Sequence, residues 1–433
     1  MNMNGQTRWM GSKTEYPLWG ILAVMGLVLI SPFVSPYLCY FAFVISICRM
    51  LRFDAKVFAV DYAILIPVCQ FYRTTGGMSL LVWLCLVAAI WFFVRGKIKV
   101  NSALVAIILL LNYLLLRMQM NISNFVLCFG QMLVLYVLLP QQDDVSAKRI
   151  VKAFCWSLVI TSLYALLFRS TAQIAAIRGA ESAAIWGTSI MRFSGLIQDP
   201  NYYITLLLVG MAALCKLKET ANISTLLFVF LIVALSVFGV LSYSKTFFVV
   251  FILLGGVYVI WQFWNKKIYK GIFFSMCAIA GLLFIVLSKN SPFAIVLARL
   301  TSGGTVSDLT TRRSDLFLVY WKSITETIGV FIFGNGLDAA LLQDKGTHNL
   351  ILECIYYIGA IGLVLITALY SGIVTGIVRH NEKTKKQNII SKYTVLLIVM
   401  VEFLALHGLF EIITYACFFV AFVSIYIVKR EQE

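Results

Sequence analysis

Hydrophobic residues along this chain form long runs that are separated by short polar segments. Crossing a bilayer takes about 20 apolar residues, so the runs between residues 18 and 428 predict about 12–14 transmembrane helices. The number is a range because four runs are short or closely spaced: 37–50, 57–72, 391–408 and 410–428. The pattern is typical of an all-α integral membrane protein, folded as a polytopic helix bundle.

Two polar segments are much longer than the others, Arg169–Pro200 and Lys289–Thr347. Connections of this length are usually functional. Within the second segment, residues Ser314–Thr327 place apolar side chains at helical spacing and predict an amphipathic helix that Gly334-Asn-Gly336 follows. We therefore expect the larger loop to be partly helical. The run at 350–378 is longer than a bilayer requires, so its first turns, with Glu353, are expected above the hydrocarbon.

Composition agrees with a membrane location. The chain is 61% hydrophobic and 12% charged, whereas soluble domains are about half apolar and a quarter charged. Its ten cysteines are scattered without a CxxC pair and it has only three histidines, so no metal site is expected. No phosphate-binding glycine loop is present, and no cofactor is expected.

The net charge of +16 first suggests a nucleic-acid partner, but the distribution of charge argues against one. Lysine and arginine collect in every second connection, which is the pattern of cytoplasmic segments. This predicts cytoplasmic N- and C-termini and places both long loops outside the cytoplasm. The chain then divides into N-terminal transmembrane helices (1–168), a first extracytoplasmic loop (169–200), central transmembrane helices (201–288), a large extracytoplasmic loop (289–349) and C-terminal transmembrane helices (350–433).

Four short motifs follow one another along the second half of the chain. They are Arg192-x-x-Gly195 with Asp199-Pro-Asn201, then Ser242-Tyr-Ser244-Lys245-Thr, then Arg313 with Trp321 and Gly334-x-Gly336, and finally His348-Asn349 with Gly359 and Gly362. In this order, over roughly residues 190–415, the chain resembles the O-antigen polymerase and O-antigen ligase superfamily. Lys245 departs from the pattern, because arginine is usual there.

The resemblance implies a metal-independent, inverting glycosyltransferase at the outer leaflet of the bacterial cytoplasmic membrane. Its donor and acceptor would be undecaprenyl-pyrophosphate-linked oligosaccharides, and its product a surface polysaccharide such as O-antigen, capsule or exopolysaccharide. Membrane lipids, a flippase and a chain-length regulator are the other partners this implies. The ligase alternative would transfer lipid-linked glycan to a lipid or cell-wall acceptor, and a polysaccharide or solute transporter is the alternative of another class.

Several residues then acquire expected roles. Neutral imidazole suits proton removal from a sugar hydroxyl near pH 7, so His348 is the candidate general base, with Glu353 beside it. Cations must stabilise a pyrophosphate leaving group, which nominates the outer-side residues Arg192, Lys245, Arg312 and Arg313. Supporting roles fall to Asn349, Asp199, His407 and Glu411.

Structural roles remain open for the same residues. His348 could cap a helix, Lys245 could be an anchor at the membrane surface, and the arginine pair could be solvated. For His407 with Glu411, a structural hydrogen bond and a functional pair are both open. Asp61 and Glu402 lie inside apolar runs, where hydrogen bonding between helices and catalysis are equally compatible with the sequence.

Overall fold

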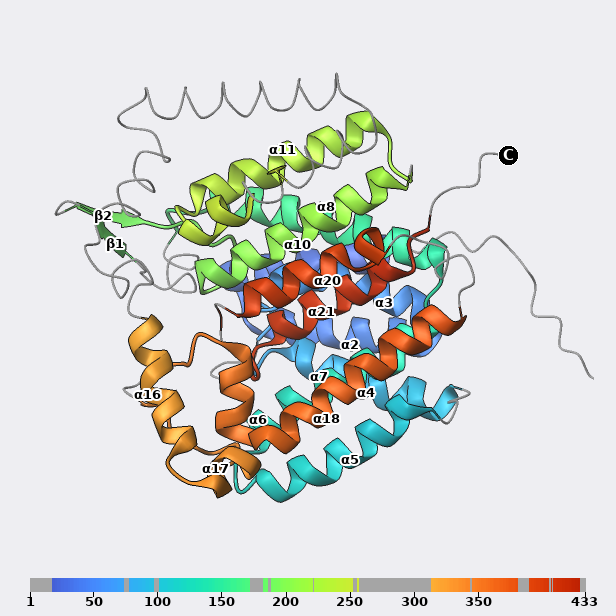
Figure 1. Cartoon of the computed structure of the whole chain (residues 1–433). Coiled ribbons are helices and arrows are strands. Elements are labelled where there is room, and N and C mark those ends of the chain that lie inside the picture. The colour runs from blue at the N-terminus through green and yellow to red at the C-terminus, as the bar shows by residue number, and fades with distance from the viewer. Residues whose placement is uncertain are drawn as a thin grey trace, which may run out of the picture.

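The protein is described by a computed structural model. The described residues are 18–73, 78–96, 101–171, 182–185, 188–220, 222–251, 255–256, 313–342, 345–380, 389–404, 406 and 408–428. Among them, helices account for nearly all regular structure (Figure 1), as predicted. One short antiparallel hairpin, β1 (Ser182–Ile185) and β2 (Thr188–Met191), was not predicted and falls in the first long loop.

The helices before this hairpin are α1 (Leu18–Val34), α2 (Tyr37–Arg52), α3 (Ala55–Leu65), η1 (Ile66–Val68), α4 (Leu80–Arg95), α5 (Ser102–Arg117), α6 (Ile122–Phe125), η2 (Val126–Gly130), α7 (Gln131–Leu138), η3 (Leu139–Gln141) and α8 (Asp144–Leu167). Those after it are α10 (Pro200–Glu219), α11 (Thr225–Leu241), α16 (Arg313–Thr325), α17 (Ile328–Phe333), α18 (Leu350–His380), α20 (Ile389–Phe403) and α21 (Ile412–Ile425).

Several of these helices could span a membrane. In the described part of the chain, four are long and apolar enough: Ile122–Gln141, Asp144–Leu167, Pro200–Glu219 and Leu350–Arg379. Five shorter helices of 10–17 residues are also apolar. Large hydrophobic side chains lie on the outside of the bundle, among them Val94, Leu116 and Leu226, which are 76%, 79% and 84% exposed. Such a surface is unfavourable in water and suits lipid.

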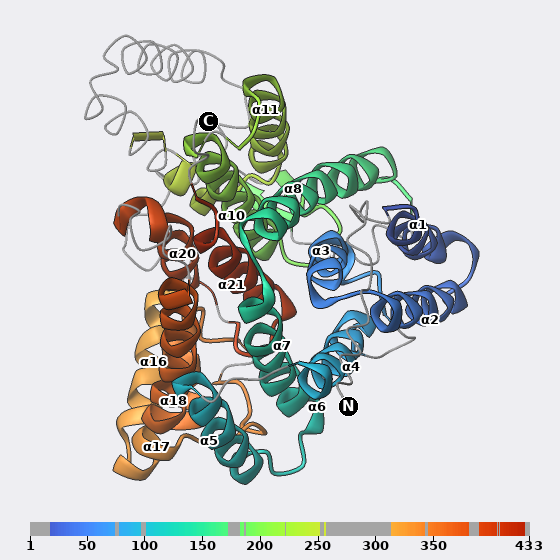
Figure 2. The ribbon, with the colours of Figure 1, turned by 90° about the vertical axis from the view of Figure 1, so that its right-hand side faces the viewer.

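The centre of the bundle is formed by α10 and α21. Every residue of α21 from Ile412 to Ile425 is buried, and α10 packs against α8, α11, α20 and α21. Figure 2 shows α21 between α7, α10 and α20, with α1 and α2 at the periphery. The predicted runs at 246–264 and 270–288 lie wholly or mostly outside the described residues.

Segments predicted to be cytoplasmic meet at one end of the bundle. Lys56 forms an ion pair with Asp143, and Lys216 donates to the carbonyl and hydroxyl of Ser391 at 2.7 and 2.9 Å. The Val428 amide donates to Asp144 at 3.1 Å. These contacts join the beginnings of α3, α8 and α20 to the ends of α10 and α21. The beginnings of α10, α18 and α21 therefore lie at the other end.

Helix α18 changes direction at Gly359, which has non-helical backbone angles of φ 67° and ψ 179°. The loop Gly334-Asn335-Gly336 fits into this kink. Asn335 and Gly336 donate their amides to the carbonyls of Tyr356 and Tyr357 at 2.8 and 2.9 Å. Arg117 of α5 donates to the Gly334 carbonyl at 2.6 Å. The kink separates the first two turns of α18, which carry Glu353, from the long remainder of the helix (Figure 1).

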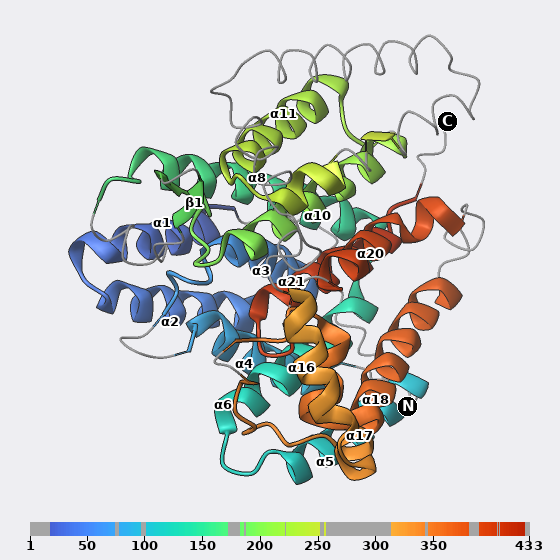
Figure 3. The same ribbon diagram turned by 60° about the vertical axis from the view of Figure 1, so that its left-hand side comes forward.

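The amphipathic helix predicted at Ser314–Thr327 is confirmed as α16. Leu316, Tyr320 and Ile324 are buried, and the Tyr320 hydroxyl donates to the Lys345 carbonyl at 2.7 Å. Figure 3 shows α16 running beside the first part of α18, with α17 at its end. Contacts between α16 and α18 agree with this arrangement. The Tyr320 contact therefore holds α16 against the segment that leads to His348.

Candidate functional site

Charged and polar side chains from five distant segments gather at one end of the bundle. They come from the end of η1, the beginnings of α10, α16 and α18, and the loop 404–411 between α20 and α21. The phenol of Tyr202 lies within electrostatic range of Asp199, Arg313, Glu353 and Glu411. The site therefore contains several of the residues that the sequence nominated, although they are separated by up to 212 positions along the chain.

His348 occupies the loop directly before α18 and has a positive φ of 49°. That conformation is uncommon outside glycine, and it persists only where neighbouring contacts hold it. The side chain is half-buried, and its Nδ1 is shielded from solvent. The backbone thus fixes the imidazole at a defined position at the edge of the charged cluster.

Asn349 caps the start of α18 and ties it to α20. Its Oδ1 accepts the Leu352 amide at 2.9 Å, and its Nδ2 donates to the Leu404 carbonyl at 3.1 Å. The capping role that was left open for His348 is therefore carried out by its neighbour. Because Asn349 is satisfied on both sides, it holds the His348 loop against the end of α20.

Glu353, one turn further along α18, is 4% exposed. Its Oε2 accepts the backbone amides of Gly408 and Leu409 at 2.5 and 3.0 Å. Hydrogen bonds to an ionised group are the stronger kind. Glu353 therefore anchors the loop 404–411 to α18, and its predicted part in proton transfer stays a prediction.

Glu411 ends that loop, directly before α21, and its side chain is partly buried. Burial raises the pKa of Glu411 from 4.5 to about 7; Arg73 opposes the rise, and Asp199 adds to it. A carboxyl group that titrates near neutral pH can exchange protons with a substrate. Its predicted companion His407 lies outside the described residues.

Arg192 contacts the segment that carries Lys245 through a backbone carbonyl. The Nε of Arg192 donates to the Ser242 carbonyl at 3.2 Å, and its Nη2 donates to Asn201 at 3.2 Å. Lys245 follows Ser242 by three residues, at the beginning of a helical segment, and is half-buried. Arg192 therefore links the Ser242 segment to the start of α10, where Asp199 accepts the Asn201 amide at 2.5 Å as the helix cap.

Arg313 is the first residue of α16 and lies within electrostatic range of Glu402. Glu402 is 1% exposed, and the Thr205 hydroxyl lies 3.3 Å from its Oε2. Through this contact Glu402 links α20 to α10 next to the charged cluster. Arg312 lies outside the described residues.

Arg73 belongs to the cluster but was not singled out from the sequence. It follows η1, donates to Gln70 at 2.5 Å and acts electrostatically on Glu411. The sequence did carry one signal. Arg73 is a basic residue in a connection predicted to lie outside, whereas the general pattern places basic residues in the cytoplasmic connections. Asp61, by contrast, forms a buried two-point ion pair with Arg49, with both distances 2.9 Å. That pair is away from the cluster and joins α2 to α3.

A comparison with family models, with curated proteins and with solved structures finds no match for this chain. What the fold defines is a helical protein with several helices that could span a membrane. The comparisons leave the likeness to the O-antigen polymerase and ligase superfamily as a resemblance carried by the motifs alone.

Proposed function

We propose that this protein is a membrane glycosyltransferase that polymerises undecaprenyl-pyrophosphate-linked oligosaccharides into a surface polysaccharide at the outer leaflet of the cytoplasmic membrane. The observation that carries the proposal is the convergence of the motif segments. Arg192 contacts Ser242, and Tyr202 at the start of α10 lies within electrostatic range of Asp199, Arg313 and Glu353. Segments that resemble one enzyme family in sequence thus contribute to a single charged site.

In this reaction, a hydroxyl oxygen of the acceptor sugar attacks the anomeric carbon of the donor from the side opposite the pyrophosphate. The bond between the anomeric carbon and the phosphate oxygen breaks, and the configuration at that carbon inverts. The hydroxyl proton passes to the imidazole of His348. Undecaprenyl pyrophosphate leaves with the bonding electron pair, so negative charge develops on its bridging oxygen.

Arg192, Lys245 and Arg313 act on that developing charge. Fixed cations in a site with restricted water stabilise a leaving pyrophosphate more in the transition state than in the ground state. Arginine also binds phosphate oxygens in pairs, whereas lysine acts as a point charge. Arg192 and Lys245 are half-buried, and this supports the role because water and salt screen a partly buried charge less than an exposed one.

The test is elongation of a lipid-linked repeat by purified protein, compared with the His348→Ala variant. We expect the variant to lose at least about 100-fold in rate, the usual contribution of a general base. His380→Ala, at the last residue of α18, is the matched control and should keep full activity. Unchanged elongation by His348→Ala at equal protein level would remove His348 from the mechanism.

A deletion strain separates the polymerase from the ligase, and the purified protein separates it from a transporter. A deletion strain that accumulates single lipid-linked repeats supports the polymerase. Accumulation of long lipid-linked chains indicates a ligase instead. Elongation by purified protein without other enzymes excludes pure transport.

A further inference from the structure

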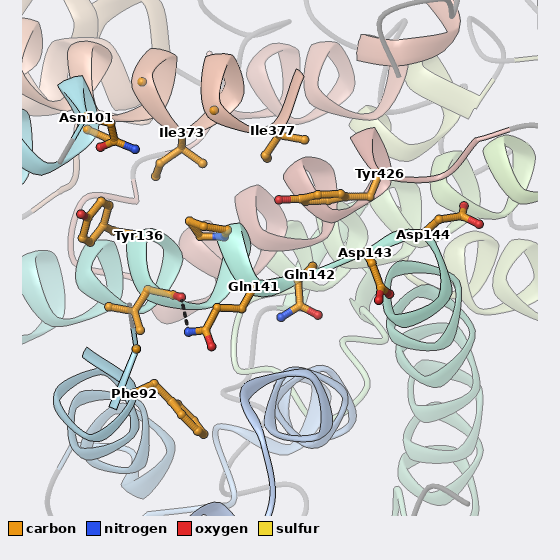
Figure 4. A pocket seen from close by; sticks show the side chains of 16 residues that line it. Phe92, Asn101, Tyr136, Gln141, Gln142, Asp143, Asp144, Ile373, Ile377 and Tyr426 are labelled. Carbon is orange, nitrogen blue, oxygen red and sulfur yellow. Dashed lines mark hydrogen bonds between the residues drawn. The ribbon is translucent and has the colours of Figure 1, made fainter. Parts of the chain in front are cut away.

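Helix α18 has different surroundings before and after its kink. Near its end it is enclosed by the chain: Figure 4 shows Ile373 and Ile377 facing the end of α7, and these side chains are 3% and 2% exposed. At the kink, around Gly359, the helix that packs against α18 is α17, and α17 itself is exposed. An apolar helix in this position needs a covering, because contact between apolar side chains and water is unfavourable.

Helix α17 consists of apolar residues and buries none of them. Ile328, Phe331 and Phe333 are 80%, 38% and 48% exposed. A helix at the surface of a soluble protein buries one apolar stripe and turns a polar face towards water. Helix α17 has no polar face, so its side chains are suited to an apolar surrounding on every side that the chain leaves open.

The exposed surface of α17 continues the exposed surface of α5. The hydroxyl of Tyr113 in α5 lies 3.0 Å from the Phe333 carbonyl oxygen and 2.7 Å from that of Ile358, and Figure 1 shows α17 beside the end of α5 at the edge of the bundle. Large apolar side chains at helical spacing form one exposed stripe along α5, which consists of Val105, Ile108, Leu109, Leu115 and Leu116. On an apolar helix of a membrane bundle such a stripe suits lipid, and α17 extends it beyond the end of α5.

The backbone at the end of α17 is satisfied by the chain itself, as hydrocarbon requires. Arg117 of α5 donates to the Gly334 carbonyl at 2.6 Å, and the Gly334 amide donates to the Val330 carbonyl at 2.8 Å. The next amide, that of Asn335, donates to the Tyr356 carbonyl. Water would satisfy these groups without help, whereas an unpaired backbone group in a bilayer is strongly unfavourable. The pairing therefore favours lipid over water as the medium around α17.

The neighbouring helix α16 has a surface that suits water. Asp315 and Lys322 of α16, and Glu326 directly after it, are exposed, and helical spacing places them on the side away from α18. Trp321 is 42% exposed next to this charged side, and tryptophan is enriched at boundaries between membrane and water. The exposed chain changes from Glu326 to the apolar Ile328 within two residues. The boundary of the apolar phase therefore falls at the start of α17.

We propose that α17 is a lipid anchor: it inserts among the acyl chains of the leaflet at the end of the bundle that carries His348. The surface of the hydrocarbon then passes between Glu326 and Ile328. The segment expected to be a large aqueous loop is interrupted by this contact, which fixes the junction of α17 and α18 at the depth of the acyl chains. The inference goes beyond the proposed glycosyltransferase activity and does not depend on it.

The measurement is the collision of a nitroxide spin label with oxygen, which concentrates in hydrocarbon, and with a polar nickel chelate, which hydrocarbon excludes. The label is attached to single cysteines in a cysteine-free full-length chain, in nanodiscs of phosphatidylethanolamine and phosphatidylglycerol. Ile328→Cys and Phe333→Cys report on α17. Leu109→Cys, on the exposed stripe of α5, is the control for lipid, and Glu326→Cys is the control for water. We expect the ratio of oxygen to nickel collisions at 328 and 333 to match that at 109 and to exceed that at 326.

Two other results would overturn the proposal, and each identifies a different surrounding. A collision ratio at 328 and 333 equal to that at 326 would show that water surrounds α17. Few collisions with either reagent, from a label that is immobile, would show that protein covers α17, either a second copy of this chain or another partner.

Photo-crosslinking repeats the test on the wild-type chain, without any substitution. The same nanodiscs then contain a phospholipid with a diazirine in the upper part of one acyl chain, and crosslinked residues are mapped by sequencing of peptides. Trypsin releases α17 within the peptide 323–345. We expect crosslinks in this peptide and on α5, and none on α21, whose residues from Ile412 to Ile425 are all buried. Crosslinks on α5 with none on α17 would contradict the proposal.

Discussion

Two carboxylates of the candidate site, Glu353 and Glu411, have different surroundings although both lie beside the loop 404–411. Glu353 accepts two backbone amides from that loop. Glu411 has no side-chain capping bond to α21, and its nearby charges are Arg73 and Asp199. Glu353 therefore holds the loop 404–411 against α18, whereas the side chain of Glu411 forms no cap and lies between the charges of Arg73 and Asp199.

For Glu353 we expect substitution by glutamine to be mild and substitution by alanine to be severe. Glutamine keeps an oxygen that accepts the amides of Gly408 and Leu409. Alanine leaves both amides buried without an acceptor, at a cost of about 2–5 kcal/mol in the free energy of unfolding. Thermal unfolding in detergent and elongation rate are the measurements. A Glu353→Gln variant with normal stability and no activity would instead assign Glu353 to proton transfer.

For Glu411 we expect an ionisation near neutral pH. Its pKa is raised from 4.5 to about 7, so the folded protein binds this proton more tightly than the unfolded chain does. The contribution of Glu411 to stability therefore falls as pH rises from about 4.5 through 7. Glu411→Gln should flatten this part of the stability–pH curve, whereas Glu326→Gln, at an exposed position after α16, should leave it unchanged. A curve that keeps its slope in Glu411→Gln would assign the ionisation to another group.

Residue roles were predictable where the chemistry is local. The Asp199-Pro-Asn201 sequence indicates a helix start, and Asp199 does cap α10. The membership of Arg73 in the cluster was not predictable, because it depends on the packing of η1 against the loop 404–411. The same holds for the bonds from Glu353 to Gly408 and Leu409, which lie 55 and 56 residues further along.

At the scale of elements, the glycines of the motifs build the junction between α17 and α18. Gly334, Gly336 and Gly359 all have positive φ, at 73°, 94° and 67°. A Cβ at Gly359 would lie 2.2 Å from the Ile332 carbonyl oxygen. The sequence identified these glycines, but the kink was not predicted, because the apolar pattern continues through it without interruption.

We expect Gly359→Ala to disrupt this junction. The new Cβ collides with backbone on the facing segment, and the left-handed conformation adds strain, so a loss of about 2–4 kcal/mol or more in unfolding free energy is expected. Gly376→Ala, in the same helix with open space around it, should be neutral or stabilising by up to about 1 kcal/mol. Thermal unfolding of the two variants side by side is the measurement. Equal melting temperatures would show that the kink tolerates a side chain.

At the scale of the whole molecule, the charge pattern and the packing assign the same segments to the same end of the helix bundle. Segments rich in lysine meet where Lys56 contacts Asp143 and Lys216 contacts Ser391. The candidate site forms at the other ends of those helices. Hydrophobic runs and charge alternation were enough to predict which segments share an end, because both depend on the chain crossing a layer repeatedly. The order in which helices pack laterally depends on side-chain fit and was not predicted.

Because the two ends of the bundle differ, the side of the membrane on which each end lies can be measured. A reaction at the outer leaflet requires the candidate site to lie outside the cytoplasm. In a cysteine-free background, Glu326→Cys and Lys345→Cys place thiols at exposed positions between α16 and α18, in the loop that the proposal puts outside the cytoplasm. Asp54→Cys and Glu219→Cys place them at exposed positions at the opposite end. A membrane-impermeant maleimide applied to intact cells, or to spheroplasts if an outer membrane is present, should label the first pair alone. The second pair should react only after the cytoplasmic membrane is opened. Labelling in the reverse order would place His348 in the cytoplasm, where the proposed lipid-linked substrates are not presented.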